Sequence, residues 1–218
     1  LLIATGLKAQ NIPIDINKES GFLLYLNGAE QYEDFDNYGD KMLMREGLTA
    51  GQKDTLSYII GITNFQRKRF EKSAFHLSAV SDSSIFFIKS YFYKAISFSE
   101  LKDFKKSFGL LDEYDLTSMG NDINSLKIHE QSGVALLMRD YVAFDTLSKS
   151  FNATDTSLQS EHQLQLQYAE KLKTLKRKSP VVAGSLSAVI PGLGLVYSGN
   201  NGQALSSFIR VAAMGALS

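Results

Sequence analysis

The sequence predicts an all-α fold, and three observations carry this prediction. Apolar residues recur at helical spacing along most of the chain, whereas the strict alternation of a half-buried β-strand is scarce. Only three of the 218 residues are proline, so long stretches are free to form helices. Aromatic residues are plentiful and are all Phe or Tyr, which suits packing between helices.

The composition excludes several kinds of function. The 23 basic and 23 acidic residues balance, so we predict no nucleic-acid partner. Cysteine is absent, which excludes disulfides, thiolate metal sites and a cysteine nucleophile. His76, His129 and His162 are scattered and lack a second ligand at helical spacing, so each is interpreted as a core or surface residue. No catalytic or nucleotide-binding pattern occurs, and we therefore predict no enzyme, cofactor, metal or small-molecule substrate.

Two segments of the chain repeat one another. Residues 61–77 align with residues 95–111 at an offset of 34 residues. The small residues Gly61 and Ala95 would let two antiparallel helices approach, and an aromatic residue would fill the gap between them. The other paired residues are Ile62 and Ile96, Lys68 and Lys102, Phe70 and Phe104, Lys72 and Lys106, Ser73 and Ser107, and Leu77 and Leu111.

Weaker copies flank these two segments. Upstream, Tyr32 and Phe35 take the positions of Phe70 and Ser73, after an apolar ridge of Phe22, Leu23 and Leu26. Downstream, at a spacing of 37 residues, the pattern recurs at Ser132, Ala135, Tyr141 and Phe144. The extra residues lie between Asp115 and Ser125, where a turn is predicted at 119–122. Phenylalanine replaces a small residue at positions 35 and 144, so looser packing is expected in the outer copies.

The period and the order of small and aromatic residues resemble the tetratricopeptide repeat family over residues 19–151. The resemblance implies antiparallel helix pairs stacked in a superhelix that binds a protein or peptide partner on the surface lined by the first helix of each pair. An aromatic, mostly uncharged groove suits an apolar peptide or helix. Alternatively, an adjoining helix buries these aromatic residues. The groove residues implied by position are Thr55, Tyr58, Ile62, Phe65, Lys89, Phe92, Ile96 and Ser99.

Residues 155–178 predict one more helix, placed to cover the open end of the repeats. Its end is strongly basic, and we expect this cluster to lie at anionic lipid headgroups. The cluster comprises Lys171, Lys173, Lys176, Arg177 and Lys178.

The tail, residues 179–218, predicts a hydrophobic helical hairpin embedded in a membrane and truncated at its end. Its two apolar stretches, 181–197 and 204–217, are rich in small residues. Arg210 would cost about 2.5–3.5 kcal/mol at the centre of a spanning helix. The tail resembles a hairpin of small bacterial membrane domains, whose pattern here comprises Pro180, Gly184, Pro191, Gly192, Gly194, Tyr197 and Gly199. The alternative is a buried hairpin that stacks on the repeats.

The first nine residues resemble the end of a secretory signal peptide, with a small residue before a polar start. The alternative is the first element of a truncated domain, and both ends suggest a fragment of a longer protein. An exported chain would place the repeats in the bacterial periplasm, although the basic cluster by itself favours the cytoplasmic side.

Together these features predict a membrane-anchored envelope scaffold or adaptor without chemistry of its own. One alternative is an accessory protein of membrane insertion or transport, in which the hairpin is the active part. The other is a soluble helical adaptor.

Overall fold

The computed structural model describes residues 14–174 of the chain. Every regular element among them is helical, so the predicted all-α class is confirmed for this part. The chain divides into two compact units, residues 1–166 and 167–218. The predicted signal remnant (1–9) and membrane hairpin (179–218) lie outside the described residues. No helix within 14–174 combines the length and the apolar character needed to cross a membrane.

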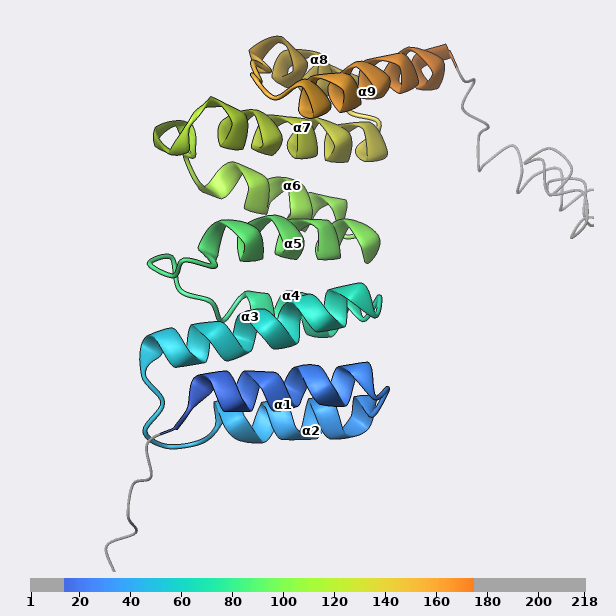
Figure 1. Ribbon diagram of the computed structural model, residues 1–218. Helices are drawn as coiled ribbons and strands as arrows, with labels where there is room; N and C mark the ends of the chain where they lie inside the picture. Colours follow the sequence, from blue (N-terminus) through green and yellow to red (C-terminus); the bar gives the residue numbers. More distant parts are fainter. Residues whose placement is uncertain (1–13, 175–218) are drawn as a thin grey trace, which may run out of the picture. The chain divides into compact units, whose positions relative to one another are not determined.

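The first unit is a stack of helices in which each helix from α1 to α7 packs on the next in sequence (Figure 1). The odd-numbered helices α1, α3 and α5 also pack on one another, so α3 lies between two such neighbours. The last helix, α9, starts in the first unit and ends in the second. The helices are α1 (Ile16–Gly28), α2 (Tyr32–Leu43), α3 (Ala50–Gln66), α4 (Phe70–Leu77), α5 (Phe87–Glu100), α6 (Phe104–Glu113), the 3₁₀ turn η1 (Thr117–Met119), α7 (Asn121–Met138), α8 (Tyr141–Ser150) and α9 (Thr156–Thr174).

Four of the connections between helices share one turn. In each turn a non-glycine residue takes the left-handed conformation, and the next N–H donates to the carbonyl five residues earlier, which satisfies the end of the preceding helix. The aromatic residue predicted at each copy is the first residue of α2, α4, α6 and α8. The left-handed residues are Glu30 (φ 59°), Lys68 (φ 57°), Lys102 (φ 65°) and Arg139 (φ 59°). The repeat read from the sequence therefore coincides with a repeated local geometry.

Small residues bring the helices of the two inner pairs close together. Ser107, fully buried in α6, donates a hydrogen bond to the carbonyl of Ala95 in α5 at 2.8 Å. In the preceding pair, a Cβ placed on Gly61 would lie 2.6 Å from Cγ of Leu77 and 3.2 Å from its backbone nitrogen. Gly61 is thus the residue that allows α4 to lie against α3.

Substituting Gly61 with alanine is expected to lower the free energy of unfolding by about 1–2 kcal/mol, because the added methyl group overpacks the contact with Leu77. Gly109 is the matched control, since it lies inside α6 and nothing approaches its Cβ position within 4 Å. Gly109→Ala is expected to stabilise the protein by about 0.5–1 kcal/mol. Urea denaturation of the two variants measures the difference. Equal changes of the same sign in the free energy of unfolding would contradict the close approach of α4 to Gly61.

The outer pairs fill the equivalent position with a phenylalanine. Phe35 of α2 is 0% exposed and Phe144 of α8 is 1% exposed, so the looser packing expected at these residues is not what the structure has. Phe35 belongs to a core cluster that includes Leu23, Leu26 and Ile60. Phe22, part of the apolar ridge identified in the sequence, is 42% exposed and packs edge-on against the ring of Tyr38.

The turn predicted at 119–122 is confirmed at its glycine. Gly120 has φ +104° and ends the 3₁₀ turn that precedes α7. The helix α7 begins directly afterwards, at Asn121. The loop is therefore shorter than the polar stretch between Asp115 and Ser125 indicated.

Candidate partner-binding face

An open pocket of about 610 Å³ lies over α3 and α5. Three residues of the predicted groove, Tyr58, Ile62 and Phe65, line it, and all three are partly exposed. From α5 the pocket receives Tyr93, which the sequence reasoning did not select. The rest of the lining comes from the turn and from helix ends, namely Gln66, Lys68, Phe70 and Glu100.

Ring contacts hold the aromatic side chains of this pocket in place. The ring of Phe65 packs edge-on against Tyr93 at 4.8 Å and against Phe70 at 5.6 Å between centroids. Tyr58 stacks on Phe86 at 4.5 Å, and burial raises the pKa of its hydroxyl. Rings that are already fixed lose little conformational freedom when a ligand covers them. The surface is therefore preorganised for apolar contact.

The other predicted groove residues do not join this pocket. Phe92 is 7% exposed and belongs to the core between α5, α6 and α7, so its assignment to a groove was wrong. Ser99 donates its hydroxyl to Ser107 at 2.9 Å, and Thr55 donates to the carbonyl of Gly51 at 2.8 Å. Lys89 is exposed on α5 and Ile96 is partly exposed, but neither lines the pocket.

The described part of the predicted lipid-binding cluster lies at the end of α9. Lys173 forms an ion pair with Glu170 at 3.1 Å, and the ammonium of Lys171 lies 5.5 Å from the ring centroid of Tyr168. Lys176, Arg177 and Lys178 lie outside the described residues, as do all the hairpin residues from Pro180 to Arg210.

The structure brings together two histidines that the sequence treated as separate. His129 of α7 and His162 of α9 have their Nδ1 atoms 3.4 Å apart, and His162 stacks on the ring of Phe151 at 3.9 Å. Gln165 strengthens the contact by accepting from Ser132 at 2.7 Å and donating to the carbonyl of His129 at 3.1 Å. These contacts hold the first half of α9 on α7.

Burial lowers the pKa of His129, and burial together with the neighbouring His129 lowers the pKa of His162. A lowered pKa means that the folded protein binds fewer protons than the unfolded chain below the ordinary value of 6.5. The free energy of unfolding is therefore expected to fall as the pH decreases below about 6.5, and the pair stabilises the protein only above that range. Urea denaturation at about pH 7.5 and pH 5.5 measures this.

His162→Gln is the variant that isolates the pair from the carboxylates nearby, among them Glu130 and Glu161. The variant is expected to lose less stability between the two pH values than the unchanged protein. An equal loss in both proteins would assign the pH dependence to other groups.

His76, the remaining histidine, is buried in α4 with its Nε2 3.7 Å from a carboxylate oxygen of Asp40. Within residues 14–174, no three side chains of the metal-binding types His, Asp and Glu gather at one place. In comparisons with known proteins, no family model, no curated protein and no solved structure matches this chain.

Proposed function

We propose that the chain is a membrane-anchored scaffold or adaptor of the bacterial envelope that binds an apolar peptide or helix of a partner through its helical repeats. The observation that carries this proposal is the aromatic pocket of Tyr58, Ile62, Phe65 and Tyr93. Partly exposed aromatic side chains in fixed positions are typical anchors of protein interfaces. Their neighbours Gln66, Lys68 and Glu100 supply a polar rim.

A tetratricopeptide-like superhelix is part of this proposal. The four equivalent turns, the small residues Gly61 and Ser107 between paired helices, and the packing of α1 on α3 and α3 on α5 support it. In such an arrangement the odd-numbered helices line one continuous surface. The aromatic pocket draws its side chains mainly from α3 and α5, which are two of these helices.

Selection of short peptides from a displayed random library on the full chain tests the partner class. The selected peptides are expected to be rich in aromatic and aliphatic residues and to bind about tenfold or more weakly to Tyr58→Ala and Tyr93→Ala variants. The matched control is Phe75→Ala, because Phe75 is an aromatic residue of α4 that is 74% exposed and lies outside the pocket. Peptides that bind all of these variants equally would overturn the proposal.

The membrane part of the proposal rests on the sequence of residues 179–218 alone. Fractionation of cells that express the full chain tests it. The chain is expected to stay in the membrane fraction after washes with high salt and with alkaline carbonate, and to need detergent for release. Release by carbonate alone would contradict an embedded hairpin and would favour the soluble adaptor.

A further inference from the structure

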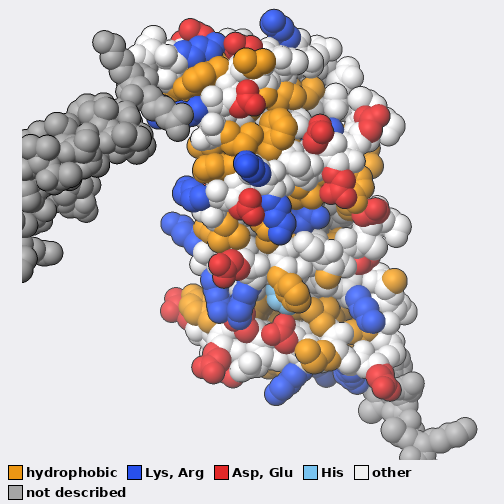
Figure 2. Space-filling view, turned by 180° about the vertical axis from the view of Figure 1, so that it is seen from behind, with side chains coloured by type: hydrophobic (Ala, Val, Ile, Leu, Met, Phe, Trp, Pro, Cys, Tyr) orange, Lys and Arg blue, Asp and Glu red, His pale blue; other side chains and the backbone are white. Residues whose placement is uncertain are grey.

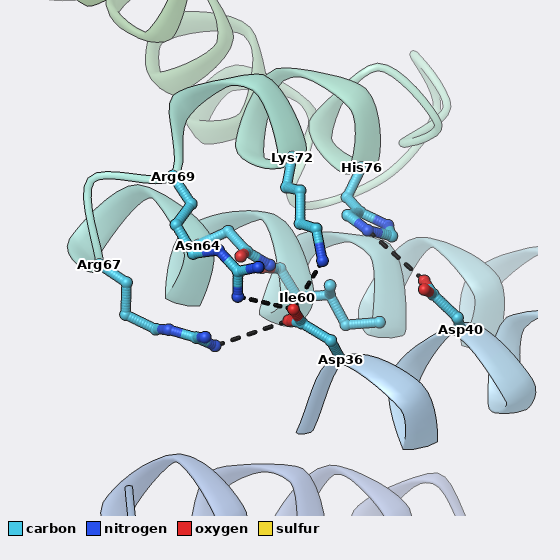
Figure 3. Close-up of polar contacts among 8 residues, drawn as sticks. All are labelled: Asp36, Asp40, Ile60, Asn64, Arg67, Arg69, Lys72 and His76. Atoms are coloured by element: carbon cyan, nitrogen blue, oxygen red, sulfur yellow. Dashed lines mark hydrogen bonds and ion pairs between the residues drawn. The ribbon is translucent and has the colours of Figure 1, made fainter. Parts of the chain in front are cut away.

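A second pocket, of about 670 Å³, lies between α2 and the start of α4 and is lined mainly by polar and charged residues, of which Figure 3 draws Asp36, Arg67, Arg69 and Lys72. Three cations point into it and converge on the carboxylate of Asp36. Nη1 of Arg69 and Nζ of Lys72 each donate to Oδ2 at 2.6 Å, and Nη1 of Arg67 lies 3.6 Å from Oδ1. The lining residues are Tyr32, Glu33, Asp36, Asn37, Arg67, Arg69 and Lys72.

The hydrogen-bonding capacity of the three cations exceeds what Asp36 can accept. A guanidinium has five N–H donors and an ammonium has three. The carboxylate of Asp36 accepts one hydrogen bond from Arg69 and one from Lys72, so most of these donors are not used by Asp36. Arg67 is largely buried, and its guanidinium lies over the ring of Tyr32 at 4.2 Å from the centroid. Arg69 and Lys72 are 38% and 45% exposed. Because both side chains are partly exposed and line the pocket, a ligand in the pocket can reach their remaining N–H donors.

The charges of the lining select the kind of anion. Three cations face Asp36 and Glu33, which leaves one positive charge in excess. A single carboxylate matches this excess, whereas a phosphate dianion or a polyanion would also meet the repulsion of both acidic side chains. The wider surface agrees, because the face in Figure 2 mixes acidic and basic side chains rather than presenting one sign.

The two pockets share a single turn. Gln66, Lys68 and Phe70 line the aromatic pocket, while Arg67 and Arg69 line the cationic pocket. Consecutive Cα atoms are about 3.8 Å apart, so residues 66–70 span at most about 15 Å. The aromatic pocket is lined mainly from α3 and α5 and the cationic pocket from α2 and α4, so a peptide that fills both passes over this turn, whose length about five extended residues match.

We infer that the pocket of Arg67, Arg69 and Lys72 binds a carboxylate side chain of the same peptide that fills the aromatic pocket. The partner segment would then carry an acidic residue within a few positions of its apolar residues. This inference rests on the proposed function, since it takes a peptide as the partner.

Fluorescence anisotropy with the full chain tests the inference, using a labelled Leu-Phe-Ala-Glu-Glu peptide and its Leu-Phe-Ala-Gln-Gln counterpart. The acidic peptide is expected to bind about tenfold more tightly, and 0.5 M salt is expected to reduce this preference. Arg69→Gln and Lys72→Gln are expected to abolish the preference, and Arg69→Lys to retain most of it. Lys105→Gln is the matched control, because Lys105 is an exposed cation of α6 outside the pocket.

Equal binding of the two peptides, a lack of binding by the acidic peptide, or the same loss in Lys105→Gln would overturn the inference. Tighter binding of a phosphoserine peptide than of the acidic peptide would overturn the assignment to a carboxylate. Thermal unfolding of each variant shows that a lost preference does not come from a lost fold. If Tyr58→Ala weakens both peptides equally and the acidic preference is absent, the inference alone fails. If Tyr58→Ala changes neither peptide while the preference persists, the aromatic site fails instead.

Discussion

Replacing Phe35 with alanine is expected to lower the free energy of unfolding by about 3–5 kcal/mol. Phe35 is fully buried in the cluster that joins α1, α2 and α3, so its removal leaves a cavity that neighbours such as Leu23 and Ile60 fill only in part. Helices α1 and α2 form one end of the described stack, and their main attachment to the rest passes through α3. The lost stability therefore affects the end of the stack, where α1 and α2 have other helices on one side only.

Phe75→Ala is the matched control, because it removes the same atoms from a side chain of α4 that is 74% exposed. We expect it to change stability by no more than about 0.5 kcal/mol. Urea denaturation followed by circular dichroism measures both variants. A loss below about 1 kcal/mol for Phe35→Ala would contradict the tight packing of the outer pair.

Phe35 also shows which features of the repeats could be predicted from the sequence and which could not. The 34-residue offset paired Phe70 with Phe104, and in the structure these residues begin α4 and α6 after the same left-handed turn. The outer copies were aligned correctly as well. Their packing was misjudged, because the sequence shows that Phe replaces Ser at this position but not that the neighbouring helix leaves room for a larger ring.

The aromatic pocket was predicted in part for a similar reason. On α3 the residues Tyr58, Ile62 and Phe65 follow a clear helical spacing, and the structure places them together. On α5 three aromatic residues stand in a row, Tyr91 to Tyr93, and helical periodicity cannot decide among them. Packing decides, because Tyr91 and Phe92 enter the core and Tyr93 remains at the surface.

The cationic pocket and the histidine pair escaped the sequence reasoning because each joins residues that are far apart in the chain. Asp36 and Arg69 are separated by 33 residues, as are His129 and His162. In a repeat array such separations are close to one period, so the two residues of each contact lie in adjacent units that pack on one another. A search for charged or titratable residues one period apart is the signal that would have found both.

Replacing Asp36 with asparagine is expected to lower the free energy of unfolding by about 2–3 kcal/mol. Arg67 is largely buried and would lose the carboxylate that compensates its charge, while the partial exposure of Arg69 and Lys72 limits the loss. Asp34→Asn is the control, because Asp34 is an exposed carboxylate of the same helix. We expect a change of about 0.5 kcal/mol or less for Asp34→Asn in urea denaturation at neutral pH.

The pH dependence gives this prediction a second readout. Partial burial of Asp36 opposes its ionisation, but the hydrogen bonds and charges of Lys72 and Arg69 outweigh that effect and lower the pKa of the carboxyl. The contribution of Asp36 to stability is therefore fully present above its ordinary pKa of 3.8 and is lost as the pH falls through the lower folded value. The difference between the unchanged protein and Asp36→Asn is expected to shrink in acid. A difference that stays constant would mean that the ionisation of Asp36 contributes no stability.

The same substitution separates the structural role of Asp36 from the ligand-binding role proposed for its cations. If Arg69 and Lys72 accept a carboxylate of a peptide, Asp36 competes with that ligand for their N–H groups. Asp36→Asn is therefore expected to bind the acidic peptide several-fold more tightly although the protein is less stable. A variant that loses both stability and affinity would indicate that the cluster only joins α2 to α4, because a purely structural ion pair gives no reason for the two quantities to change in opposite directions.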